Sequence, residues 1–98
     1  PSVLECLRFG RQNAITREQL KIKTGLNDRS IRDEISRLRL QHVIINLSNG
    51  EGYYLPTEDE KPAVRDFIRQ EESRAKTSLS TLMCARKFLG DDNMQLKI

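Results

Sequence analysis

Within residues 24–55, the spacing of the apolar residues changes once, from that of a helix to that of β-strands. This change limits the possible folds more than any other feature of the sequence. Gly25 and Asn27 suit a turn and a helix N-cap. Apolar residues then recur at the helical spacing i, i+4, i+7, as Ile31, Ile35 and Leu38. A β-branched run and an Asn-Gly turn signal come next. The pattern predicts a helix over about 28–41, followed directly by a β-hairpin.

Two shorter helices are predicted before this segment. Residues 2–5 (Ser-Val-Leu-Glu) and 16–19 (Thr-Arg-Glu-Gln) both have the form of a capping box, which marks a helix start. We expect the first helix to end at Gly10, because glycine is the usual residue just after a helix. We expect the second helix to cover about 17–24.

The predicted hairpin pairs residues 43–45 (Val-Ile-Ile) with residues 53–55 (Tyr-Tyr-Leu) across a turn at 48–52. A two-stranded hairpin is only marginally stable in water. It must therefore pack on the helices or pair with a third short strand, for which Ala14-Ile15 is the candidate. Because neighbouring residues of a strand face opposite sides, we expect one tyrosine in the core and the other at an interface.

A long helix is predicted from about Pro62 to Leu89, with Gly90 ending it. Its apolar residues follow a spacing close to a coiled coil that Glu71 interrupts. Two arrangements satisfy this pattern: the helix folds back on the same core, or it pairs with the same helix of a second copy. We expect a homodimer. The expected dimer contacts are Leu79, Leu82, Met83 and Leu89.

These elements predict a chain that is mainly α with a small β-hairpin, an α+β fold class. The predicted organisation is a folded domain over 1–56, a C-terminal helix over 57–90 and a tail over 91–98. The residues that carry the order of elements are Thr16, Leu20, Gly25-Leu26-Asn27-Asp28-Arg29, Ile31-Arg32, Ile35, Leu38-Arg39, Val43-Ile44-Ile45, Gly50 and Gly52-Tyr53-Tyr54-Leu55.

Over about residues 2–56, this order and spacing resemble the winged helix-turn-helix domain at the N-terminus of biotin-repressor-type regulators. Small phage and prophage DNA-binding proteins are similar. The resemblance implies duplex DNA as the ligand, with the third helix in the major groove and a hairpin wing beside it. It implies a small transcriptional regulator or a phage-type DNA-binding protein. One alternative is a winged helix that docks proteins in a replication or phage assembly complex, since one fold serves several functions. The other is a nonspecific nucleic-acid binder, which would bind without discriminating between sequences.

Charge and composition agree with a polyanion as partner. The chain has a net charge of +3, and residues 1–50 hold nine Lys/Arg against five Asp/Glu, a net charge of +4. No apolar run approaches the roughly 18 residues that span a bilayer, so we expect a cytoplasmic protein without membrane contact. Cys6 and Cys84 are expected to be small buried hydrophobes. Because His42 is the only histidine and no Cys/His cluster occurs, we expect neither an enzyme, nor a metal, nor a cofactor.

The third predicted helix would present its N-terminal residues to base edges and its flanks to phosphates. A projection at about 100° per residue puts Arg32 and Arg39 on a flank suited to phosphate. It puts these residues opposite the apolar stripe: Arg29, Asp33, Ser36, Arg37 and Leu40. The expected DNA-binding residues are Thr16, Arg17, Asn27, Arg29, Ser30, Arg32, Asp33, Ser36, Arg37 and, on the wing, Asn49. The plainer interpretation is a solvated helix face, supported by ion pairs Arg29–Asp33 and Asp33–Arg37.

Overall fold

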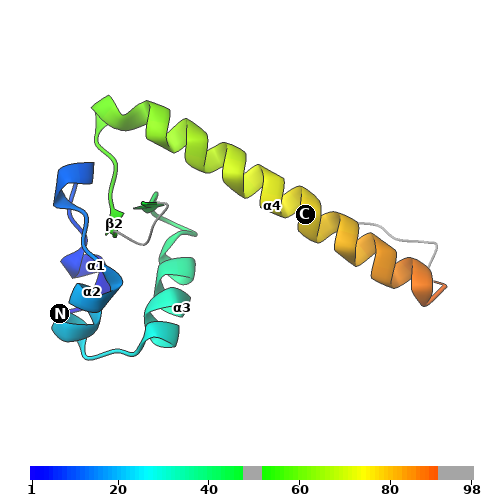
Figure 1. Ribbon diagram of the computed structural model, residues 1–98, viewed down its shortest axis with the longest axis horizontal. Helices are drawn as coiled ribbons and strands as arrows, with labels where there is room; N and C mark the ends of the chain where they lie inside the picture. The colour runs from blue at the N-terminus through cyan, green and yellow to red at the C-terminus, as the bar shows by residue number, and fades with distance from the viewer. Residues whose placement is uncertain (48–51, 91–98) are drawn as a thin grey trace. The chain divides into compact units, whose positions relative to one another are not determined.

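The computed structural model describes residues 1–47 and 52–90, and it divides into two compact units, Pro1–Arg65 and Asp66–Ile98 (Figure 1). The elements are, in order, α1 (Val3–Cys6), η1 (Arg11–Asn13), α2 (Arg17–Thr24), α3 (Asp28–Leu38), β1 (Ile45–Asn46), β2 (Tyr53–Tyr54), η2 (Glu58–Glu60) and α4 (Lys61–Phe88). The predicted class, mainly α with a small antiparallel hairpin and a long C-terminal helix, is confirmed.

The core of the first unit lies where α1, α2 and α3 meet one another and the hairpin. The predicted stripe of α3 faces inward, with Ile31, Ile35 and Leu38 all buried. Leu20 of α2 and Ile44, just before β1, are fully enclosed against it. Burial of these side chains, each contributing roughly 1.5–3 kcal/mol, fixes which face of α3 remains in solvent.

The predicted helix starts are confirmed by hydrogen bonds. Ser2 and Glu5 form a reciprocal capping box, with distances of 3.1 and 3.2 Å between side-chain oxygens and backbone nitrogens. Thr16 and Gln19 form the second, at 2.9 and 3.1 Å. At α3, the Asn27 side chain accepts from the Ser30 amide at 2.8 Å. Each cap satisfies amides that the first turn of a helix leaves without partners.

The first helix ends earlier than predicted, at Cys6 and not at Gly10. Long-range pairing is the reason. The amide of Gly10 donates to the Leu55 carbonyl at 2.8 Å, and the Leu55 amide donates to the Arg8 carbonyl at 2.9 Å. Leu7 is already extended and Phe9 forms a bridge with Leu55, so the helix cannot continue through these residues.

The hairpin forms where it was predicted, but its strands are shorter: β1 begins only at Ile45 and includes Asn46, and β2 ends at Tyr54. The predicted third partner is present. Ile45 is opposite Tyr54, and Asn46 is opposite Tyr53. Ile15 pairs with Tyr53 through two backbone hydrogen bonds of 2.9 and 2.8 Å, an isolated antiparallel bridge beside the two-stranded sheet. Tyr54 is buried and Tyr53 is half-buried, as the alternation predicts. The predicted turn lies largely outside the described residues.

The helix α4 runs for 28 residues and none of them is fully buried. Gly90 follows it with a φ of +77°, as expected of a residue that ends a helix. Cys84 lies exposed on α4, so its predicted burial is wrong, whereas Cys6 is buried as predicted. The prediction failed because this part of α4 has no neighbouring element to cover Cys84 among the described residues of its unit. Within residues 1–47 and 52–90, no helix is long and apolar enough to cross a membrane.

Candidate nucleic-acid interface

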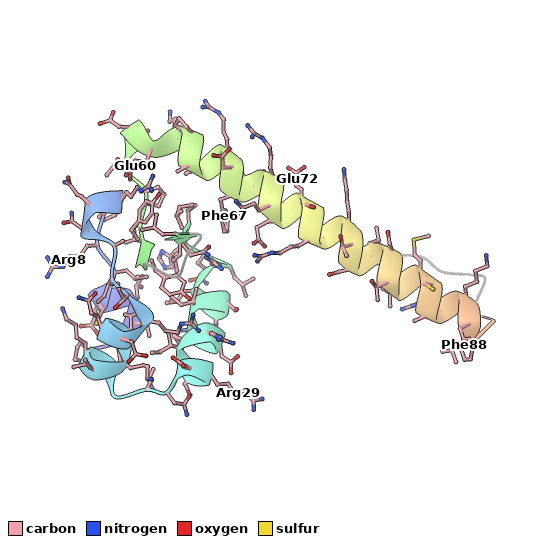
Figure 2. The ribbon with its side chains drawn as sticks, in the orientation of Figure 1. Arg8, Arg29, Glu60, Phe67, Glu72 and Phe88 are labelled. Carbon is pink, nitrogen blue, oxygen red and sulfur yellow. The ribbon has the colours of Figure 1, made fainter. Side chains whose placement is uncertain are left out.

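The solvent face of α3 is a polar surface on a firmly held helix. Arg29, Arg32, Asp33, Ser36 and Arg37 are exposed on it, and Ser30 is half-buried. Figure 2 shows Arg29 at the N-terminal end of α3, with its side chain directed away from the helix. A buried apolar stripe on one side and a cationic face on the other are what a recognition helix requires, because the groove-facing side must be free of protein contacts.

The arginines of this face differ in their partners. Arg37 forms an ion pair with Glu34, one turn earlier. The expected pairs Arg29–Asp33 and Asp33–Arg37 do not form, while the plainer interpretation of a solvated face stays a prediction. Within the described residues, neither Arg29 nor Arg32 pairs with a carboxylate. Two guanidinium groups are thus free of carboxylate partners, and guanidinium binds guanine edges and phosphates bidentately.

The N-terminus of α2 offers a second set of donors. The Thr16 side-chain oxygen accepts from the Gln19 amide, so its hydroxyl hydrogen can still donate outward. Arg17 follows it and is half-buried. Asn27 is similar at α3: its oxygen is engaged by the Ser30 amide, and its NH₂ group remains as a donor. Donors at helix N-termini are suited to phosphate oxygens, because the positive end of the helix dipole lies there.

Lys21 connects the two helices. Its ammonium group lies 3.3 Å from the Glu18 carboxylate in α2 and 3.9 Å from the Asp28 carboxylate at the start of α3. The side chain is one-third exposed, so its aliphatic stem lies along the helix while the charge reaches solvent. The contact spans the turn at Gly25 and sets the first turn of α3 relative to α2.

Arg39 has a different role from the phosphate contact that we expected. Its Nε donates to the Ile44 carbonyl at 3.1 Å, and its terminal nitrogen donates to the Asn46 side chain at 3.0 Å. Arg39 therefore ties the end of α3 to β1 and positions the hairpin beside the helix. No sequence signal pointed to this role, because its partners are a backbone carbonyl and an asparagine that only the fold brings near.

The remaining predicted residues divide between described and undescribed parts. Asn49, the predicted wing contact, lies outside the described residues. The predicted dimer contacts lie in the second unit: Leu82, Met83 and Leu89 are exposed on and just after α4, and Leu79 is half-buried. The predicted DNA-binding residues from Thr16 to Arg37 all lie in the first unit, on the adjacent helices α2 and α3 or at their N-caps.

The Glu60 carboxylate links two segments of the first unit that are far apart in sequence. Glu60 accepts hydrogen bonds of 2.9 Å from the amides of Thr57 and Arg11. These two bonds hold the pKa of the Glu60 carboxyl below its ordinary value. Burial raises the pKa of the nearby Tyr54 above that of an exposed tyrosine. Glu60 therefore connects η2, which follows the hairpin, to η1.

Within the described residues, no group of three or more His, Cys, Asp or Glu side chains is placed to hold a metal ion. Comparison of the chain with protein-family models, with curated proteins and with solved structures gave no match. The residues themselves are therefore the basis for the functional proposal.

Proposed function

We propose that the protein binds duplex DNA through the solvent face of α3, as a small transcriptional regulator or a phage-type DNA-binding protein. The proposal rests on one observation above all. Arg29 and Arg32 project from a capped helix whose opposite face is buried, and within the described residues neither meets a carboxylate. We also propose a location in the cytoplasm, where a bacterial or phage-type regulator meets its DNA.

The chemistry assigns different tasks to the residues. Arg29, at the N-terminal end of α3, and Arg37, which would exchange its exposed ion pair with Glu34, would read guanine O6 and N7, and each such contact is worth roughly 1–3 kcal/mol of discrimination. Arg32 on the flank would bind phosphate, together with the donors at Thr16 and Arg17. Asp33 and Ser36 would accept or donate at the remaining base edges.

A protein-docking module is the second candidate, and one surface favours it. Leu40, just after α3, is 83% exposed, and the nearby Val43 is half exposed. Exposed apolar side chains so close together are common at protein interfaces. This candidate predicts no affinity for DNA and a partner that covers Leu40.

The test compares a selected duplex with an unrelated duplex by fluorescence anisotropy, using two double variants. Arg29→Ala with Arg37→Ala removes the proposed base contacts. Arg8→Ala with Arg11→Ala is the matched control: both arginines are exposed in the same unit, and the change in net charge is the same. Figure 2 shows Arg8 on the opposite side of this unit from Arg29.

We expect the α3 variant to lose discrimination between the two duplexes by about tenfold or more for each contact removed. The control variant should keep its discrimination and lose only a small, sequence-independent part of its affinity. Equal behaviour of the two double variants would contradict the proposal. Absence of binding by the parent protein, combined with loss of a protein partner in Leu40→Asp, would support the docking module instead.

A further inference from the structure

The side chains that α3 presents to solvent are of three chemical kinds. The guanidinium groups belong to Arg29, Arg32 and Arg37, the carboxylate to Asp33 and the hydroxyl to Ser36, and all five side chains are exposed. The helix itself contains neither asparagine nor glutamine. Base pairs differ in the major groove by their pattern of donors and acceptors. The kinds of side chain on this face therefore limit which base pairs it can recognise.

The amide side chains at the N-terminal ends of α2 and α3 are held in helix caps. The Asn27 oxygen accepts from the Ser30 amide at 2.8 Å. The Gln19 oxygen accepts from the Thr16 amide at 2.9 Å. An amide side chain recognises adenine with both of its ends, since its oxygen accepts from N6 while its NH₂ group donates to N7. Turning either oxygen toward a base would release a cap and destabilise the helix start.

Gln41 is the next amide side chain along the chain, and it lies beyond the C-terminal end of α3. Recognition helices bring their N-terminal residues to the base edges, so Gln41 is at the wrong end of the helix to read them. The face of α3 is thus equipped with arginine and aspartate, and it lacks an amide that is free to pair with adenine.

Arg29 and Asp33 lie one turn apart on the same side of α3. Four residues separate them, which places them about 6 Å apart along the helix axis. Base pairs stack about 3.4 Å apart, so the two side chains can reach base pairs that are at most two steps apart. Within the described residues, neither side chain forms an ion pair. Both are therefore available to a ligand in the groove.

We propose that this face selects G·C over A·T base pairs in the major groove, with Arg29 on a guanine and Asp33 on a cytosine within two base pairs of it. The inference rests on the proposed function and adds the class of sequence that the same site takes. Arginine donates to O6 and N7 of guanine together, and a carboxylate accepts from N4 of cytosine.

The carboxylate of Asp33 also rejects the other bases. Guanine and thymine present only acceptor atoms or a methyl group at the major-groove edge, and adenine presents its donor beside an acceptor. Cytosine alone presents a donor with no acceptor next to it. An unpaired carboxylate facing acceptor atoms is repelled, so Asp33 discriminates by excluding wrong bases as well as by binding the right one.

Selection of bound duplexes from a random library, followed by fluorescence anisotropy, tests the preference. We expect G·C pairs at the core of the selected sequence. Replacing them by A·T pairs should weaken binding by about tenfold or more. Inosine in place of guanine is the matched control, because it keeps O6 and N7 and loses only the amino group in the minor groove. It should bind like guanine. Adding that amino group to the A·T duplex, as 2,6-diaminopurine, should not restore binding.

Variants of the protein test the assignment of residues. Glutamine in place of arginine can pair with N6 and N7 of adenine, so Arg29→Gln should change one selected position from guanine to adenine. Asp33→Asn should remove the cytosine preference at a second position. Arg8→Gln is the matched control: Arg8 is exposed on the opposite side of the unit from Arg29 (Figure 2), and the charge change is the same. It should select the parental sequence. Circular dichroism checks that each variant keeps its helices.

Three results would each overturn the inference and leave DNA binding intact: equal affinity for the G·C and A·T duplexes; loss of binding on replacing guanine by inosine; or an Arg29→Gln variant that selects the parental sequence. Absence of binding to any duplex at low salt is a different outcome. It would reject the proposed function, and this inference with it.

Discussion

Replacing Gly52 by alanine is expected to destabilise the first unit strongly. Gly52 has a φ of +136°, a conformation that L side chains rarely adopt. A Cβ built there lies 2.7 Å from the Ile15 carbonyl oxygen and 2.8 Å from its carbon, and both are backbone atoms that no side-chain rotation can move away. Ile15 is the residue whose two hydrogen bonds with Tyr53 form the bridge between the start of the chain and the hairpin.

The magnitude follows from two contributions. The unfavourable backbone conformation costs roughly 1–3 kcal/mol for a residue other than glycine. Relief of the contact moves Ile15 away from Tyr53 and weakens two hydrogen bonds worth about 1 kcal/mol each. We therefore expect Gly52→Ala to lower the free energy of unfolding by about 3–5 kcal/mol, a large share of the 5–15 kcal/mol typical of a small domain.

Gly25→Ala is the matched control. Gly25 also has a positive φ, +76°, but a Cβ there meets nothing within 4 Å. It should cost only the left-handed penalty of roughly 1–2 kcal/mol. Urea unfolding followed by tyrosine fluorescence measures both variants, because the chain has no tryptophan and Tyr54 is buried in the affected unit. If Gly52→Ala costs no more than Gly25→Ala, the close approach to Ile15 does not exist in solution.

Three further predictions concern the first unit and α4. Ile31→Ala should lower stability by about 2–5 kcal/mol in urea unfolding, whereas Ile22→Ala, at an 82% exposed position, should change it by less than about 0.5 kcal/mol. Backbone amides hold the pKa of Glu60 low, so its stabilisation is full above the ordinary glutamate pKa and lost as the pH falls through the lowered value. The stability difference between parent and Glu60→Gln should therefore shrink on acidification. In the native protein Cys84 should react rapidly with a thiol reagent, and Cys6 only on unfolding.

Local features of the sequence predicted much of the fold. The capping boxes at Ser2 and Thr16 and the cap at Asn27 were predictable because each depends on residues three positions apart in sequence. The inward stripe of α3 was predictable for the same reason, since helical spacing alone decides which residues share a face. The pairing of Ile15 with Tyr53 followed from the instability of an isolated hairpin.

Long-range contacts account for what the sequence did not reveal. The early end of α1 depends on bonds between residues 8–10 and Leu55, far apart in sequence. The link from Arg39 to the Ile44 carbonyl had no signal of its own, because an arginine at a helix end fits phosphate contact equally well. For the candidate site, the exposed face of α3 was predictable, but the ion pair of Arg37, which is with Glu34, was assigned to the wrong carboxylate.

Fluorescence anisotropy of the parent protein with random-sequence duplex DNA, repeated over a series of salt concentrations, tests the central claim most directly. Binding through Arg29, Arg32 and neighbouring donors predicts measurable affinity at low salt. It also predicts a steep linear fall of log affinity with log salt, with a slope of about −0.9 for each phosphate contacted. Absence of binding at low salt, or an affinity that does not change with salt, would contradict the assignment of α3 as a DNA-binding surface.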